Sequence, residues 1–470
     1  MSKQGRQTEL FGGHVLNLDS GEQEERSLFI SGGRLMSSLD DAKEWDRVDC
    51  HGLFLIPGLV DSHVHFSQTG LPDGRPDSLD LTRFYPFDQV VHELQTTGPQ
   101  RFFPTYLGSG VTSVMDVGGF PWTFDMARAS VNNPNSPNIA VTGPLLSTIE
   151  FKRLNPGQEC SFLYVPDEDS ARARVRYLVG SPEHGGLGSP MVKIWFIPRA
   201  GAFEQQSRVV QAATEEAKAL GARVCVHATG RAEALRALMA GCDYLVHSVE
   251  DAPLGRDFIQ RCLRQHTILC PTLTVMEGYT RLTEVLSTGT APVLDDPNHL
   301  VDAITRARAA RLPELVDEGA RARMTPARLE ATQARTAKGL RQASQNLLAL
   351  VSAGVPVCAG TDAGNPLTLH GVSIHRELEA MQAAGLSPLA VLRAATRNGA
   401  LAMGRPGELG DLRPGAAADV VALRADPIQE GVRACRQVEW VVRAGVRKTI
   451  GQYQAQVMHT DQTLRPLLLA

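Results

Sequence analysis

The chain has 470 residues, a formal net charge of −4, 43% hydrophobic residues and 21% charged residues. This length can bury a large core and suggests more than one domain, and the composition is that of an ordinary globular protein. The mild negative charge gives no sign of a nucleic-acid or membrane partner. No apolar run reaches the ~18 residues that span a bilayer, and the first residues contain no apolar signal core. The eight cysteines show no CxxC spacing, which favours a reduced, cytoplasmic protein without disulfides.

Residues 9–54 have the pattern of short strands and turns. From residue 55 onward, short apolar runs alternate with amphipathic helices, as expected for parallel strands covered on both faces. Eight strands are predicted, at 53–60, 111–116, 139–142, 192–196, 223–226, 244–246, 268–273 and 356–359. Eight strands with intervening helices predict an α/β fold, a (β/α)8 TIM barrel.

The helices between these strands include 205–220 and 232–240. A further helix is predicted after Ser387, with Ser387 as N-cap, Pro388 at the first helical position and Gly404 at the end. The charged, helical region 278–345 is an insertion, interpreted either as a lid over the catalytic side or as a peripheral hairpin.

Residues 405–449 again have the pattern of short strands. Two β segments that flank a barrel can pair with each other. We therefore expect a composite β-sandwich domain from 1–56 and 405–470, beside a barrel domain of 57–404.

The first barrel strand leads directly into His63 and His65. Side chains alternate along a strand, so these two imidazoles point to the same side. Two imidazoles at the end of a buried strand can bind one metal ion. The motif is a weak signal by itself, because many HxH triplets lie on surfaces by accident.

Barrel active sites form at the carboxyl ends of the strands, and further candidate ligands follow there. They are Lys193, His227, His247 and Asp362. Each alone has a simpler explanation, such as a hydrogen-bonded structural histidine or an N-cap aspartate. Lysine is almost never buried without a reason, and Lys193 lies between Val192 and Ile194 in a predicted central strand. Together with the HxH pair, these residues predict a metal site.

This arrangement resembles the amidohydrolase superfamily over nearly the whole chain. The resemblance rests on the run from Pro57 to His65, on Lys193, His227 and His247, and on Gly360-Thr361-Asp362-Ala363-Gly364. The segment from Gly407 to Val421 looks like the family's closing β segment. Within the superfamily the chain is most similar to the imidazolonepropionase- and prolidase-like branch, through the Thr361-Asp362 segment, His370-Gly371, Glu377-Leu378 and residues 394–398. Members often carry a second histidine where this chain has Thr229.

The resemblance implies a binuclear centre with two divalent metal ions. His63, His65 and Asp362 would hold the first metal, and His227 and His247 the second. Lys193, carboxylated by CO2, would bridge them. Zinc is the default expectation for this ligand set, although ligand chemistry alone does not identify the metal.

Two metals would lower the pKa of a bridging water and supply hydroxide. Asp362 would accept the proton and pass it to the departing amine. His370 is a second catalytic candidate, for binding substrate or a developing oxyanion, or else a loop histidine that caps a helix. Asp61 is better explained by a structural or supporting role.

The predicted function is hydrolysis of amide C–N bonds in a small-molecule substrate, a dipeptide or an N-acyl amino acid. Alternatives are a mononuclear deaminase or cyclic-amidine hydrolase on the same fold, a lactonase or phosphoesterase, and a scaffold without the chemistry. Lys193 argues against the mononuclear enzymes, which generally lack a bridging lysine. Homo-oligomerisation is compatible with the sequence, which does not identify an oligomeric state.

Overall fold

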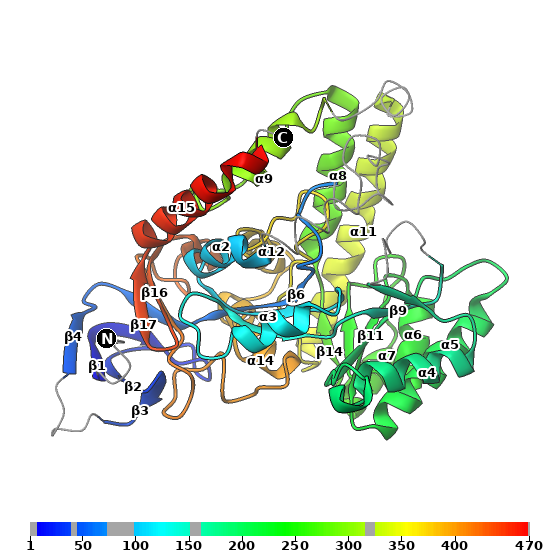
Figure 1. Ribbon diagram of the computed structural model, residues 1–470, viewed down its shortest axis with the longest axis horizontal. Helices are drawn as coiled ribbons and strands as arrows, with labels where there is room; N and C mark the ends of the chain where they lie inside the picture. Colours follow the sequence, from blue (N-terminus) through cyan, green and yellow to red (C-terminus); the bar gives the residue numbers. More distant parts are fainter. Residues whose placement is uncertain (1–6, 39–44, 73–97, 151–160, 315–324, 469–470) are drawn as a thin grey trace.

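The computed structural model describes residues 7–38, 45–72, 98–150, 161–314 and 325–468. Strands from both ends of the chain pair in one eight-stranded sheet (Figure 1). These strands are β1 (Gln7–Leu16), β2 (Gln23–Ser31), β3 (Arg34–Met36), β4 (Trp45–Asp49), β5 (Phe54–Pro57), β15 (Val420–Leu423), β16 (Val438–Arg443) and β17 (Val446–Thr449). The antiparallel β5–β15 pair, with Ile56 opposite Val421, joins the two ends.

The C-terminal part of the expected β domain is not all β structure. Residues Ile450–Leu468 form helix α15, which packs on α2 (Phe103–Gly108) and α9 (Ala303–Arg311). The division into one domain of 1–56 with 405–470 and a second of 57–404 stays a prediction.

The remaining strands form two parallel sheets. The smaller contains β6 (Leu59–Val64), β7 (Val111–Asp116) and β8 (Asn138–Val141); the larger contains β9 (Leu145–Ser147), β10 (Phe162–Tyr164), β11 (Met191–Trp195), β12 (Arg223–His227), β13 (Tyr244–Val246) and β14 (Ile268–Cys270). The predicted eighth strand, 356–359, forms no regular strand. Its Val357 makes an isolated parallel bridge to Leu269 of β14, and Ala363 makes one to Val64 of β6. This segment therefore connects the two parallel sheets.

The predicted strand 53–60 is wrong as a single strand. Gly58 divides the apolar run into β5, which joins the sheet of the chain ends, and β6, which pairs with β7. A side chain at Gly58 would overlap the side chain of Thr112, with a Cβ only 2.8 Å from Thr112 Cβ. The absence of a side chain lets the backbone turn from one sheet to the other at this close contact.

Gly58→Ala should therefore destabilise the fold. Overpacking of this kind typically costs about 1–3 kcal/mol of unfolding free energy, measurable by urea unfolding. Adding Thr112→Ala should recover part of the loss. Gly451→Ala, at a helical glycine whose added Cβ would meet only Thr449 Oγ1 at 3.9 Å, is the matched control and should keep or raise stability, by at most about 1 kcal/mol. Equal stability of Gly58→Ala and wild type would contradict this explanation of the strand break.

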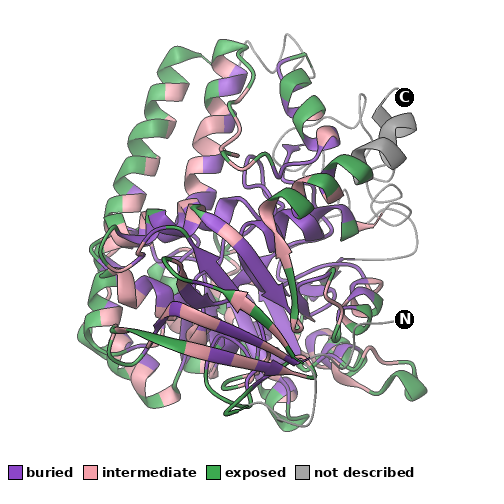
Figure 2. Cartoon of the chain, turned by 90° about the vertical axis from the view of Figure 1, so that its left-hand side faces the viewer, coloured by how far each residue is buried: buried purple, intermediate pink, exposed green. Residues whose placement is uncertain are grey.

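Helices cover the parallel strands, with buried inner faces and exposed outer faces (Figure 2). Besides α2, α9 and α15, the described helices are α3 (Thr123–Ala129), α4 (Glu168–Val179), α5 (Phe203–Ala219), α6 (Arg231–Ala240), α7 (Arg256–Gln265), α8 (Leu273–Thr288), α11 (Pro326–Ser352), α12 (Ser373–Ala383), α13 (Pro388–Ala394) and α14 (Arg397–Ala402). Short 3-10 turns lie at Pro99–Phe102, Pro182–His184 and Val432–Arg436. None in the described part of the chain has both the length and the apolar character needed to cross a membrane.

The helix predicted after Ser387 begins as expected but is two helices. Ser387 Oγ accepts the Ala390 N–H at 3.2 Å, which caps α13. The chain breaks at Thr396 before α14, and Gly404 follows α14 in a left-handed conformation. At this break Ala395 O accepts the Val60 N–H at 2.6 Å. The break between α13 and α14 thus provides a carbonyl group that accepts a backbone hydrogen bond from β6.

The predicted insertion contains the long helices α8 and α11, which pack against each other and extend away from the sheets (Figure 1). Residues 315–324 of the insertion lie outside the described residues. The start of α8, through Val275, Met276 and Tyr279, belongs to the wall of the candidate site.

Candidate active site

The HxH motif places both imidazoles beside Asp362. His63 lies near the end of β6, and Asp362 follows the segment that connects the two parallel sheets. His63 Nε2 lies 3.2 Å and His65 Nε2 3.1 Å from Asp362 Oδ1, and the two Nε2 atoms are 3.3 Å apart. Four ligands in a tetrahedron at ~2.0–2.1 Å from a zinc ion are about 3.3 Å from one another. The three atoms therefore have the spacing of ligands to one small metal ion.

Hydrogen bonding orients His65 for this role. Its Nδ1 lies 2.9 Å from Gly118 O and donates to that carbonyl, which leaves Nε2 facing Asp362. Burial lowers the pKa of His63 to about 3, which favours the neutral form of this ring. Burial alone would raise the pKa of Asp362, but His63 and His65 outweigh it and hold that pKa well below its usual value. Two imidazole nitrogens and a carboxylate oxygen thus converge, an arrangement that a cation stabilises.

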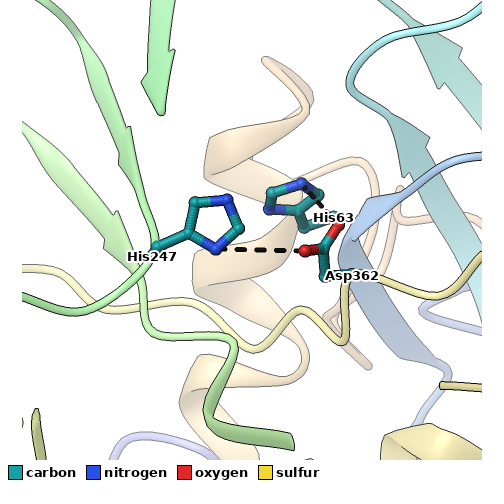
Figure 3. Close-up of side chains that lie close together, drawn as sticks. All are labelled: His63, His247 and Asp362. Carbon is teal, nitrogen blue, oxygen red and sulfur yellow. Dashed lines mark ion pairs between the residues drawn. The ribbon is translucent and has the colours of Figure 1, made fainter. Parts of the chain in front are cut away.

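His247 approaches the same carboxylate from the other sheet (Figure 3). It follows β13, and its Nδ1 is 4.0 Å from Asp362 Oδ2. With His63 and Asp362 it forms a group whose potential ligand atoms all lie within 4.8 Å of one another. The His247 ring is 5.0 Å from that of His63 and 4.3 Å from that of His227, between centroids.

Two of these residues have a strained backbone. His247 has φ 77° and Asp362 φ 61°, values that non-glycine residues rarely adopt. Such conformations persist only where the surrounding structure holds them, and they cluster at functional sites.

Lys193 lies within β11, paired in register with Cys225 of β12. Its side chain is 2% exposed, and Nζ has no hydrogen-bond partner among the described residues. Burial lowers the pKa of Lys193, against the opposing effects of Cys225 and Asp362. A buried amine without an acceptor is costly, so this residue needs a partner that the described protein does not provide.

Asp61, on β6, has the supporting position that the sequence suggests. Its carboxylate accepts hydrogen bonds from Thr361 N at 2.9 Å and Thr361 Oγ1 at 2.7 Å. Burial raises the pKa of Asp61 to about 7. These bonds fix the residue directly before Asp362.

Sequence reasoning missed two further positioning groups. Asp116, at the end of β7, accepts the Phe66 and Gly118 N–H groups at 2.9 and 3.0 Å, which fixes the carbonyl that orients His65. Thr272 Oγ1 lies 2.7 Å from His247 Nδ1. The one available sequence signal was an acidic residue at the end of a predicted buried strand, in the case of Asp116.

Glu377 supports Thr272 from α12. Its carboxylate accepts the Leu273 and Thr274 N–H groups at 3.0 and 2.9 Å, which caps the start of α8. Glu377 is fully buried, and burial raises its pKa to about 7. Glu377 entered the sequence prediction only as part of a family signature.

Glu377→Ala should leave two buried N–H groups without acceptors. Each such group costs about 1–3 kcal/mol, so we expect a loss of at least ~2 kcal/mol of unfolding free energy in denaturant titrations. Glu330→Ala, at an exposed position on α11, is the control and should stay within about 0.5 kcal/mol of wild type. A Glu377→Ala variant as stable as this control would contradict the capping role.

His370 is not brought to this cluster. Its Nδ1 lies 2.8 Å from Tyr106 Oη, and its Nε2 lies 2.8 Å from Gln68 O. The ring stacks on Phe102 with centroids 4.1 Å apart, and burial lowers its pKa to about 3. Both nitrogens are engaged by the protein, which favours the structural interpretation over the catalytic one.

Five of the six predicted ligands line one cavity of about 330 Å³. Side chains from the ends of several strands and from the start of α8 form its walls. The described lining residues are His65, Ser67, Gln68, Gly118, Leu145, Ser161, Phe162, Lys193, Trp195, Ile197, His227, Thr229, His247, Glu250, Val275, Met276, Tyr279, Asp362 and Asn365. His65, Lys193, His227, His247 and Asp362 thus share one cavity, while the buried His63 and His370 are not part of its lining.

Comparisons with known proteins agree with this geometry. Residues 54–450 match the model of the amidohydrolase family. An uncharacterized protein of Mycobacterium tuberculosis is 27% identical over 422 residues, which cover 88% of this chain and 90% of that protein. Among solved structures, a Xaa-Pro dipeptidase with bound methionine in the active site has a TM-score of 0.68 at 21% identity, over 94% of this chain and all of that chain. An ochratoxinase of A. niger has a TM-score of 0.65 at 20% identity, over 95% and 96% of the two chains.

Proposed function

Because the chain belongs to the amidohydrolase family, we propose that it is a metal-dependent hydrolase that cleaves amide C–N bonds at this cavity. The observation that carries the proposal is the triangle of His63 Nε2, His65 Nε2 and Asp362 Oδ1, with sides of 3.1–3.3 Å. This spacing of two imidazole nitrogens and a carboxylate oxygen is that of the ligands of one small cation.

The residues fit a pair of divalent ions, with zinc as the first candidate. His63, His65 and Asp362 would hold one ion, and His227 and His247 the other. Carboxylated Lys193 would bridge them, which converts a buried, unpartnered amine into an anionic ligand with two oxygens. The orphaned Nζ supports this assignment.

We also infer that the two parallel sheets form one (β/α)8 barrel. The support comes from the segment 356–363, which bridges β14 through Val357 and β6 through Ala363. The chain also passes directly from β8, in one sheet, to β9, in the other. In a closed barrel the proposed ligands share the carboxyl ends of the strands, the usual position of active sites in this fold.

When bound, divalent ions lower the pKa of water and polarise a carbonyl group. Asp362 is the proton carrier in this proposal. Its Oδ1 faces the two imidazoles, which leaves Oδ2 to take a proton from water and deliver it to the departing amine nitrogen. Without that proton the amine would leave as an amide anion, a very poor leaving group.

The proposed substrates are dipeptides or N-acyl amino acids. The cavity has polar side chains beside an apolar and aromatic wall, a combination that suits a small organic amide. The likeness of the fold to a Xaa-Pro dipeptidase and to an ochratoxinase is compatible with such substrates. Thr229 lines the cavity where related enzymes often carry histidine, so we expect a specificity different from theirs.

The test is a screen of the metal-loaded protein against dipeptides, N-acyl amino acids, lactones and cyclic amidines. We expect hydrolysis of at least one amide class, lost on chelation and restored by divalent metal. Turnover confined to cyclic amidines would favour the deaminase-like alternative, and turnover confined to lactones the lactonase. Absence of turnover in all four classes would contradict the proposal.

A further inference from the structure

The charge of the cavity wall is unbalanced outside the proposed metal ligands. Among the described lining residues, Glu250 is the one carboxylate apart from Asp362, and no arginine is present. Lys193 is the one lysine there, and the proposed carboxylation removes its positive charge. The described wall therefore contains no cation to receive a substrate carboxylate, but it contains an anion beyond the ligands.

A backbone hydrogen bond fixes the position of Glu250. It lies three residues after His247, and its N–H donates to Thr229 O at 3.0 Å. This bond ties the loop after β13 to the loop after β12. The Glu250 side chain is half-buried, and no lysine, arginine or histidine of the described residues forms an ion pair with it within 4.0 Å.

The groups around Glu250 compensate the negative charge of its carboxylate poorly. Burial raises the pKa of Glu250, and the neighbouring Asp251 adds to this effect, while Arg335 opposes it. On α11, Gly339 lies against the same group: a Cβ there would be 3.3 Å from Glu250 Oε2 and 2.7 Å from Met276 Cε. A glycine inside a helix costs about 1 kcal/mol relative to alanine, and here it leaves room for two residues of the cavity wall.

The rest of the wall is largely apolar and aromatic. The side chains of Phe162 and Trp195 meet edge to face with centroids 5.2 Å apart, and Val275 and Met276 contribute from α8. An aromatic face and a carboxylate in one cavity are the two features that attract an organic ammonium ion.

We propose that Glu250 is a specificity-determining residue that selects amide substrates with a cationic nitrogen beside an apolar or aromatic group. The inference rests on the proposed amide hydrolysis. It narrows the substrate to aminoacyl-type amides with a free ammonium group, in preference to N-acyl amino acids, whose carboxylate Glu250 would repel.

The experiment uses three amides of one skeleton with the metal-loaded protein. These are 3-phenylpropanamide and its analogues with an ammonium or a carboxylate at C2. We expect wild type to prefer the ammonium compound, and Glu250→Gln to lower the ratio of kcat/KM for the ammonium and neutral compounds by about tenfold or more. Asp251→Asn removes the same charge from the neighbouring residue, which does not line the cavity, and should keep the ratio within about twofold of wild type.

Binding of phenethylamine, measured by calorimetry, gives a second readout that needs no turnover. We expect Kd to rise about tenfold or more in Glu250→Gln and to stay unchanged in Asp251→Asn. If none of the amides is cleaved but this difference in Kd is found, the proposed reaction fails while the ammonium site stands. If the kcat/KM ratio and Kd are both the same in Glu250→Gln as in wild type, the inference is overturned.

Discussion

Lys193→Ala is expected to lose bound metal and to reduce kcat by about 10³-fold, because metal-assisted catalysis is worth several kcal/mol. In the wild type, Nζ is buried without a hydrogen-bond partner among the described residues, on the wall of the cavity that His227 and His247 share. Removal of the side chain removes the proposed bridge and opens a space of its size. Short carboxylic acids such as propionate should enter that space and restore part of the activity.

Lys193→Met is the matched control for this rescue. Methionine fills the same space but cannot be carboxylated, so we expect loss of metal and no response to carboxylic acids. Both variants are assayed for metal by elemental analysis and for folding by circular dichroism. A folded Lys193→Ala protein with wild-type metal content and full turnover would make Lys193 a structural residue.

Asp362→Asn is expected to lower kcat by at least ~10²-fold, the lower end for loss of a general acid–base. Asparagine keeps the size of the side chain but cannot take the proton at the position of Oδ2. It also replaces an anion that His63 and His65 approach to 3.1–3.2 Å, so metal content is measured alongside kcat. A variant with wild-type metal content and near-normal kcat would remove Asp362 from the mechanism.

The order of strands and helices was predictable from the sequence because apolar runs and amphipathic periods are local. The strands at 111–116 and 244–246 have the predicted bounds. The predicted bounds were wrong where one continuous local pattern contacts two different parts of the fold. The apolar run at 53–60 contributes to two sheets, and only the contact of Gly58 with Thr112, distant in sequence, shows where it divides. The helix from Ser387 is interrupted because Ala395 O bonds to Val60, which no helical period reveals.

For the site, the sequence indicated the histidine, lysine and aspartate residues, because these residue types are uncommon together at the ends of buried strands. His65, Lys193, His227, His247 and Asp362 lie on one cavity, with His63 directly against Asp362. Their assignment as metal ligands stays a prediction. His370 has the right residue type, but its stacking on Phe102 and its bond to Tyr106 depend on segments more than 250 residues away.

The positioning groups that sequence reasoning missed, or named only as part of a family signature, are of ordinary residue types. Asp116, Thr272 and Glu377 matter only through what they touch, namely the backbone of Phe66 and Gly118 beside His65, the ring of His247 and the first turn of α8. A buried acid in a helix, or a threonine after a strand, has many simpler explanations. Only the three-dimensional contacts distinguish them.

The central claim is that this cavity holds a pair of metal ions, and its most direct test is the metal content of the folded protein. Purified protein is stripped with a chelator, loaded with zinc in the presence of bicarbonate, desalted and analysed for metal and protein concentration. We predict two ions per chain in wild type and fewer in Lys193→Ala. A wild-type content of one ion or none, under conditions in which the protein is folded, would contradict the two-metal account.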